Sequence, residues 1–353
     1  MEYGVAFASE VDSWKWTKRA EELGYSSAWF YDTQLLNPDV FICMALAAAN
    51  TQKIRLGTGV LVPTNRIEPV TANAFASLNK LAPNRIDFGV GTGFTARRTM
   101  GLNAVPLAQT RAYIERVQSM LRGETVEWDF EGKDRKIRFL NPDLGLINIE
   151  DEIPLWISAF GPRARQMTAE LGAGWLNFGA GDAAVQGLVE MQTAWRGEGR
   201  ESDDLNSVLF TVGSVLTGDK ETDDIKVMAE AGPYTAVIFH GAADAAGMFD
   251  SHKPEGPLAK TLESYMETHQ RYEPHDARYL QNHRGHLMFV RPEETHLNPE
   301  LVRATSMSGT RDELVDEVGR LKDAGYGQLT VQLIHGHEEA LEEWAEVFQL
   351  CGL

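Results

Sequence analysis

The chain has 353 residues, of which 43% are hydrophobic and 24% charged, and it carries a formal net charge of −18. A surface this acidic repels phosphate backbones and anionic lipid headgroups, so we expect neither nucleic acid nor a membrane surface as a partner. The two cysteines lie far apart and no Cys/His cluster has zinc spacing, so no metal site is predicted. The N-terminus lacks the basic and long apolar regions of a signal peptide, and we expect a cytoplasmic protein.

Short apolar strands alternate with helical segments along the first half of the chain. Strands are predicted at residues 3–8, 26–32, 53–62 and 85–91. Helices are predicted after them at residues 11–24, 37–51, 68–83 and 107–123. Gly24 stands where a C-cap glycine belongs, and Pro38 suits a helix start. The first half therefore repeats one strand–helix unit four times.

The second half continues the alternation and adds two longer segments. Strands are predicted at residues 153–160, 175–179, 206–218 and 327–334. Helices are predicted at residues 162–174, 183–199, 223–239, 310–326 and 337–350. Residues 123–152 alternate polar and apolar side chains, which predicts a hairpin or an extended excursion. Residues 236–306 form a long insertion with a helical stretch at 258–272, and loops this long are usually lids or binding elements.

Eight strand–helix pairs predict parallel strands buried beneath helices, which is the α/β class. We therefore expect one domain over residues 1–353, a (β/α)8 TIM barrel with insertions after strand 4 and before strand 8. A doubly wound open sheet is the alternative, but it usually has fewer units and a glycine-rich loop after its first strand. The segment Gly91-x-Gly93-x-x-Ala96 matches a dinucleotide-binding fingerprint, yet three strand–helix units precede it, so its context excludes that interpretation.

Small residues crowd the predicted C-terminal strand ends, where the function of a parallel barrel sits. They leave room for a flat ligand, although single glycines also follow barrel strands for other reasons. They are Gly57, Gly59, Gly91, Gly93, Ala159, Gly161 and Gly179. In "AFGPRA" (159–164) a helix begins near Pro162, with Arg163 beside it. A helix N-terminus with an arginine suits a phosphate, and an ordinary turn with surface arginines is the alternative.

Ionisable side chains elsewhere are further candidates. Arg97 and Arg98 lie on a predicted loop and suit a phosphate, a substrate carboxylate or a salt bridge to one of many acids. Asp32 ends the second strand and suits either a ligand hydrogen bond or a loop salt bridge. His240 and His286 in the insertion suit proton donation or plain packing. Because no Ser/His/Asp or paired-carboxylate pattern stands out, a cofactor must carry the chemistry.

The chain resembles the bacterial luciferase-like family of flavin- and deazaflavin-dependent oxidoreductases over nearly its whole length. The resemblance rests on "AEELGYSSAWFYD", "KIRLGTGVLVPTNRIEPVTANAFASLNKLAPNRIDFGVGTG", "PLWISAFGPRARQMTAELGAGWL" and "SGTRDELVDEVGRLKDAGYGQL". It implies a (β/α)8 barrel with an isoalloxazine-type ring across the strand ends, backed by a non-prolyl cis bond between Gly59 and Val60. It also implies cofactor-edge contacts from Gly91 and Gly93, and phosphate-side contacts from Gly161, Pro162 and Arg163.

Two sub-classes of the resembled family remain open. One uses reduced FMN and oxygen to insert an oxygen atom, and the other uses the 8-hydroxy-5-deazaflavin coenzyme to move hydride. Thr33 stands where deazaflavin reductases often carry a histidine, so we favour an FMN-dependent monooxygenase of a small organic substrate, with Asp32, His240 and His286 as catalytic candidates. The resemblance then implies a homodimer and a separate flavin reductase as partners. The deazaflavin reductase and a silent flavin-binding or accessory barrel are the alternatives.

Overall fold

Eight parallel strands close into a barrel in the computed structural model, which describes residues 1–244 and 257–352. The strands are β1 (Glu2–Phe7), β2 (Ser27–Phe30), β3 (Arg55–Thr58), β4 (Ile86–Val90), β7 (Leu155–Ser158), β8 (Gly174–Phe178), β9 (Ser207–Thr211) and β12 (Gln328–Leu333). Closure is made by β12 pairing with β1, with Val331 opposite Val5. The predicted (β/α)8 barrel is thereby confirmed.

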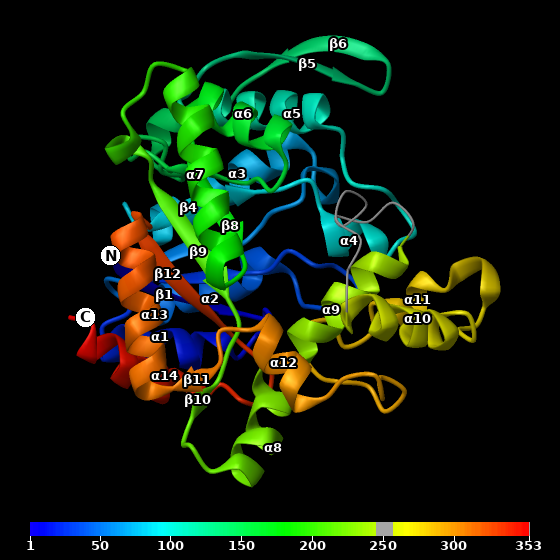
Figure 1. Cartoon of the computed structure of the whole chain (residues 1–353). Helices are drawn as coiled ribbons and strands as arrows, with labels where there is room; N and C mark the ends of the chain where they lie inside the picture. The colour runs from blue at the N-terminus through cyan, green and yellow to red at the C-terminus, as the bar shows by residue number, and fades with distance from the viewer. Residues whose placement is uncertain (245–256, 353) are drawn as a thin grey trace.

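Helices surround the barrel and bury its outer face (Figure 1). They are α1 (Ser13–Leu23), α2 (Val40–Asn50), α3 (Glu68–Leu81), α5 (Leu107–Leu121), α6 (Pro162–Leu171), α7 (Gly181–Gly197), α8 (Lys220–Glu230), α13 (Arg311–Ala324) and α14 (Ala340–Leu350). A smaller cluster around Trp29 and Phe210 fills the barrel interior. Gly24 ends α1 in the left-handed conformation, as predicted for a C-cap glycine. Within the described residues, no helix combines the length and apolar character needed to cross a bilayer.

Three predicted elements differ from the structure, each for a local reason. The strand predicted at 206–218 is β9 followed by β10 (Val215–Leu216), which pairs with β11 (Gly309–Thr310) outside the barrel. Gly213 makes this departure possible, because a Cβ there would lie 1.8 Å from the Met307 carbonyl oxygen. The helix predicted at 223–239 is α8 and α9 (Gly232–Ala243), since Pro233 favours the first turn of a new helix. Residues predicted as a loop around Arg97 form the short helix α4 (Phe94–Arg98).

The two insertions lie in different places (Figure 1). The first forms the predicted hairpin, β5 (Val126–Phe130) antiparallel to β6 (Lys133–Ile137), outside the helix ring. The second contains α9, α10 (Pro257–His269), α11 (Tyr279–Asn282) and α12 (Pro299–Thr305). The helix predicted at 258–272 is confirmed as α10, and residues 245–256 of the insertion lie outside the described residues. Because the second insertion packs beside α4, it covers part of the rim at the C-terminal strand ends, which we call the barrel mouth.

Candidate cofactor site at the barrel mouth

The chain bulges at the mouth directly after β3. The peptide bond between Gly59 and Val60 is cis, as the family resemblance implies. The Gly59 N–H donates to the Phe30 carbonyl at 2.7 Å, and Leu61 then bridges to Val90 on β4. Val60 itself is half-buried, so its side chain is available as a backing surface at the mouth.

The glycines at the mouth serve two different purposes. A Cβ on Gly91 would lie 2.8 Å from a Val60 methyl, and one on Gly93 would lie 2.5 Å from a Val62 methyl. Both glycines therefore make room for the bulge itself. Around Gly161 and Gly179, by contrast, nothing described lies within 4 Å of the added Cβ. Open space for a ligand therefore lies beyond the ends of β7 and β8.

Apolar side chains make the floor of the mouth. Tyr31, Val60 and Phe178 are partly buried and pack on the interior cluster around Trp29 and Phe210. Ala159, which we expected at the cofactor, is fully buried, and its carbonyl accepts a hydrogen bond from Trp175 at 2.8 Å. An aromatic and aliphatic floor with few polar groups suits a flat heteroaromatic ring.

The N-terminus of α6 borders the open space and carries positive charge. Gly161 caps the helix and Pro162 is its first residue, and both are exposed. Arg163 is also exposed and makes no hydrogen bond or ion pair with any residue that the structure describes. Arg165, on the same helix, is instead paired with Glu190. An uncommitted arginine at an accessible helix N-terminus is suited to a phosphate group, so these residues fit a phosphate-bearing flavin-type cofactor.

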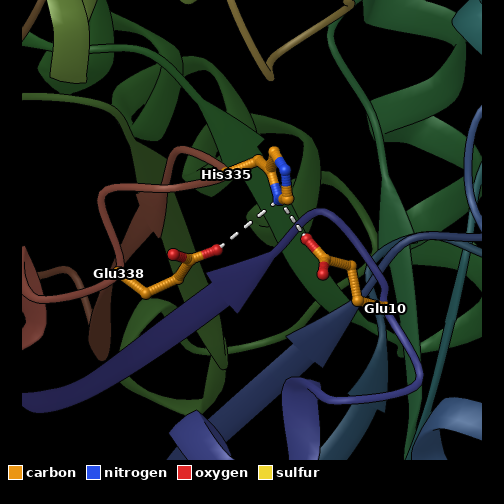
Figure 2. A group of neighbouring side chains, drawn as sticks. All are labelled: Glu10, His335 and Glu338. Atoms are coloured by element: carbon orange, nitrogen blue, oxygen red, sulfur yellow. Dashed lines mark hydrogen bonds and ion pairs between the residues drawn. The ribbon is translucent and has the colours of Figure 1, made fainter.

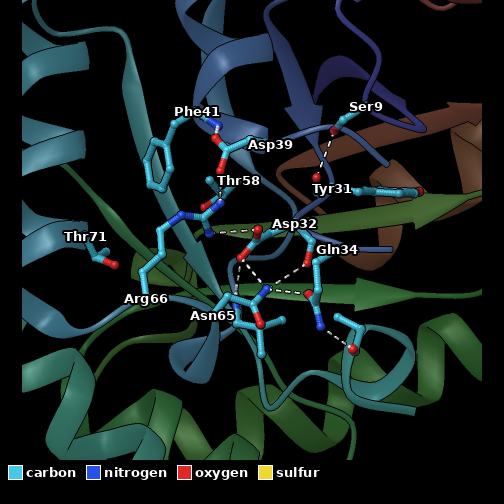
Figure 3. Close-up of polar contacts among 12 residues, drawn as sticks. Ser9, Tyr31, Asp32, Gln34, Asp39, Phe41, Thr58, Asn65, Arg66 and Thr71 are labelled. Carbon is cyan, nitrogen blue, oxygen red and sulfur yellow. Dashed lines mark hydrogen bonds and ion pairs between the residues drawn. The ribbon is translucent and has the colours of Figure 1, made fainter. Parts of the chain in front are cut away.

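Asp32 clamps the loop that follows the bulge (Figure 3). Its carboxylate is only 4% exposed and accepts a hydrogen bond from Arg66 at 2.9 Å. The same carboxylate accepts from the Asn65 side chain at 3.0 Å and from the Val62 backbone N–H at 3.2 Å. Of the two roles weighed from the sequence, the geometry gives Asp32 the loop salt bridge.

The clamp extends to neighbouring loops of the mouth (Figure 3). Arg66 also pairs with Asp39, the residue that caps α2. Asn65 donates to the Gln34 side chain at 2.7 Å, and Gln34 donates to the Ala96 carbonyl of α4 at 2.5 Å. One polar network therefore ties together the loops that follow β2, β3 and β4.

Arg97 and Arg98 are engaged by protein oxygens. Arg97 donates to the Thr64 hydroxyl at 2.7 Å and to the Asn103 carbonyl. Arg98 donates to the Asn103 side chain at 3.1 Å and lies 4.0 Å from an Asp244 oxygen in the second insertion. Both arginines therefore join α4 to its surroundings. Arg98 lies within ion-pair distance of Asp244, whereas the described partners of Arg97 are neutral oxygens.

The two candidate histidines lie within or beneath the second insertion. His240 is 2% exposed, and its ring contacts Glu294 and Arg291, both of the insertion. Burial lowers the pKa of His240 to about 4. His286 bonds to the Thr95 hydroxyl of α4 at 2.9 Å, and burial also lowers its pKa. His240 therefore belongs to the insertion's own core, whereas His286 joins the insertion to the rim.

The structure brings together a polar group that was given no role from the sequence (Figure 2). His335 follows β12 and Glu10 follows β1, and the two side chains are paired. Glu338 lies 3.8 Å from the same imidazole nitrogen, and one donor atom from each of the three residues lies within 4.8 Å of the others. Both strands were predicted correctly, so their pairing across the barrel closure was the signal that could have linked these residues.

Comparisons with known proteins agree with this geometry. The luciferase-like monooxygenase family matches residues 12–328, and the chain belongs to that family. It is 24% identical over 335 residues to a 5,10-methylenetetrahydromethanopterin reductase of Archaeoglobus fulgidus, covering 93% of this chain and 92% of that protein. It is 32% identical to an F420-dependent glucose-6-phosphate dehydrogenase of Beutenbergia cavernae, over 46% of this chain and 50% of that one.

Solved structures share the fold at lower identity. The coenzyme F420 dependent tetrahydromethanopterin reductase of Methanopyrus kandleri superposes with a TM-score of 0.70 at 20% identity, covering 98% of this chain and 97% of that one. The oxygenating constituent of 3,6-diketocamphane monooxygenase of Pseudomonas putida, in complex with FMN, superposes with a TM-score of 0.65 at 16% identity, covering 98% and 95%. The chain is therefore a luciferase-like oxidoreductase by family and by fold.

Proposed function

We propose that this protein is a deazaflavin-dependent reductase or dehydrogenase, which moves hydride between the 8-hydroxy-5-deazaflavin coenzyme and a small organic substrate. The observation that carries the proposal is the likeness to relatives whose names specify F420-linked or methylenetetrahydromethanopterin chemistry, one of them over 93% of this chain. We therefore favour a deazaflavin-dependent enzyme over the FMN-dependent monooxygenase, which Thr33 favours from the sequence alone. The monooxygenase stays the second candidate, because the family carries that description and one similar structure binds FMN.

Different residues of the mouth would bind different parts of the cofactor. Val60 and Phe178 would support the apolar ring, and Arg163 with the N-terminus of α6 would hold the phosphate of the side chain. Asp32 would keep the bulge in place through the Val62 N–H and Arg66. When bound, the deazaflavin supplies the two-electron chemistry, and the chain supplies orientation and proton handling.

Proton handling at the mouth falls to the pair of Glu10 and His335. The pair lies at the ends of two adjacent barrel strands, and the His335 side chain is 47% exposed, so it is open to a substrate. His240 is enclosed within the insertion and has no such access. An imidazole oriented by a carboxylate is a suitable acid or base for a proton that accompanies hydride transfer.

Equilibrium binding tests this proposal directly. Titration with oxidised deazaflavin coenzyme, followed by its fluorescence, should show saturable binding, and Arg163→Ala should raise Kd at least tenfold, since a charge-assisted phosphate contact is lost. Arg163→Lys should recover part of that affinity. Arg196→Ala is the control, because Arg196 is an exposed arginine on α7 bonded to Ser202 and Thr193. Failure of the wild-type protein to bind the coenzyme, or an equal effect of the control, would overturn the proposal.

A further inference from the structure

A buried glutamine inside the barrel holds the hydroxyl of Tyr31. Gln332 lies on β12 and is 1% exposed. The Tyr31 hydroxyl donates to its side-chain oxygen. The amide nitrogen of Gln332 is buried as well, and no described residue accepts a hydrogen bond from it. Buried donors are usually hydrogen-bonded, so this nitrogen has bonding capacity that the described residues do not use.

A second glutamine on the same strand is hydrogen-bonded through both the oxygen and the nitrogen of its amide. Gln328 lies four residues earlier on β12, on the same face of the strand. Its oxygen accepts from the Trp29 indole and from the Thr330 hydroxyl, both at 3.3 Å, and its nitrogen donates to the Ser26 hydroxyl at 3.0 Å. Those contacts fix the orientation of the Gln328 amide, whereas the part of the chain that the structure describes gives the Gln332 amide one hydrogen bond.

An amide held at one end can turn over without breaking any other hydrogen bond. With its oxygen toward Tyr31, Gln332 accepts a hydrogen bond from the Tyr31 hydroxyl and leaves the Tyr31 oxygen free to accept one from a ligand. With its nitrogen toward Tyr31, Gln332 donates, and the Tyr31 O–H is free to donate to a ligand. The pair can therefore serve either a donor or an acceptor atom at the same position.

Tyr31 stands beside the bulge that would back the cofactor ring. In the register of β2 and β3, Phe30 lies opposite Thr58, and the next N–H, that of Gly59, donates to the Phe30 carbonyl. Tyr31 is partly buried and packs on the same interior cluster as Val60, and its ring points away from Asp32 into the barrel (Figure 3). A two-electron carrier ring has a nitrogen that accepts a hydrogen bond when oxidised and bears a hydrogen when reduced.

We propose that Tyr31 and Gln332 form a reversible hydrogen-bonding pair that binds this ring nitrogen in both redox forms, with Tyr31 in contact with the ring and Gln332 positioning the hydroxyl. This inference rests on the proposed function. It assigns redox-form recognition to two residues, and it requires no covalent step. The readout is the ratio of the Kd values of the oxidised and reduced coenzyme, which sets the midpoint potential of the bound form.

Gln332→Glu tests the pair. A protonated carboxyl can donate or accept like the amide, but an ionised carboxylate can only accept from Tyr31. For Gln332→Glu, we divide the Kd of the oxidised coenzyme by the Kd of the reduced coenzyme and normalise this ratio to that of wild type at the same pH. The normalised ratio should rise at least tenfold as pH rises and the glutamate ionises. Tenfold corresponds to a midpoint potential higher by about 30 mV for a two-electron couple. Tyr31→Phe should weaken both forms at least threefold, and it provides a second measurement if the glutamate variant does not fold.

Gln328→Met is the matched control. It removes an anchored amide from the same strand and should lower Tm while leaving the Kd ratio unchanged. A flat pH profile in Gln332→Glu, or unchanged affinity in Tyr31→Phe, overturns the inference while wild-type binding leaves the proposed function standing. If wild-type protein binds neither form of the coenzyme, the proposed function fails and the inference fails with it.

Discussion

Replacement of Asp32 by asparagine tests the clamp on the bulge loop. The change removes the charge that faces Arg66, while Arg66 stays partly buried with a side chain 16% exposed. It also sets an amide N–H₂ against either Arg66 or the donors of Val62 and Asn65. Breaking a buried ion pair from one side costs about 3–5 kcal/mol, and the lower value applies here because Arg66 keeps Asp39 as a partner. With about 2.1 cal/mol/K of unfolding entropy per residue, a chain of 353 residues should lose about 4 °C in Tm.

Asp39→Asn is the internal comparison for this experiment. Asp39 shares Arg66 with Asp32, but its side chain is 41% exposed, and asparagine can still cap α2. An exposed ion pair is worth at most about 1 kcal/mol, so Tm should fall by only about 1 °C. Scanning calorimetry measures both variants, and coenzyme titration should show weaker binding for Asp32→Asn alone. Equal Tm values for Asp32→Asn and wild type would refute the clamp.

Four further variants probe space at two glycines and charge at two buried ionisable residues. Gly91→Ala should lower Tm, since its Cβ would lie 2.8 Å from a Val60 methyl. Gly161→Ala should leave Tm unchanged, because no described atom lies within 4 Å of its Cβ, and equal Tm values for the two variants would contradict this contrast. Burial lowers the pKa of His240 to about 4. The neutral imidazole therefore contributes about 3 kcal/mol to the free energy of unfolding above pH 6.5, and this is lost as pH falls through 4. His240→Gln should reduce this pH dependence, as measured by denaturant titrations at a series of pH values. Burial raises the pKa of Glu230 to about 7, so stability is lost as pH rises from 4.5 through 7 and the buried carboxyl ionises. Glu230→Gln should therefore raise the free energy of unfolding by up to about 3 kcal/mol over wild type at pH 8, but not at pH 4. Equal stabilities at pH 8 would contradict this.

The barrel was predictable because its signals are local. Each strand is a short apolar run and each helix has caps and periodicity of its own, so the alternation determines the class. The breaks at Gly213 and Pro233 were missed because a strand or helix pattern continues through them. At Gly213 the decisive neighbour is Met307, which is remote in sequence and reveals nothing locally.

The site was predictable only in part, because its side chains meet through tertiary contacts. Asp32 and Arg66 are 34 residues apart, and His240 and Glu294 are 54 apart, so neither pair has a sequence period. Gly91 was correctly placed at the mouth, but its use, as space for Val60, depends on the cis bulge. The exposed turn at Arg163 was easier to interpret, since a helix start with a nearby arginine is a local pattern.

Competition between the two cofactors tests the central claim most directly. Wild-type protein loaded with oxidised deazaflavin coenzyme is titrated with FMN while the fluorescence of the bound coenzyme is followed. If the protein moves hydride to or from the deazaflavin, a hundredfold excess of FMN should displace little of the bound deazaflavin coenzyme. Complete displacement by equimolar FMN would contradict the proposed function and return the protein to the flavin monooxygenases.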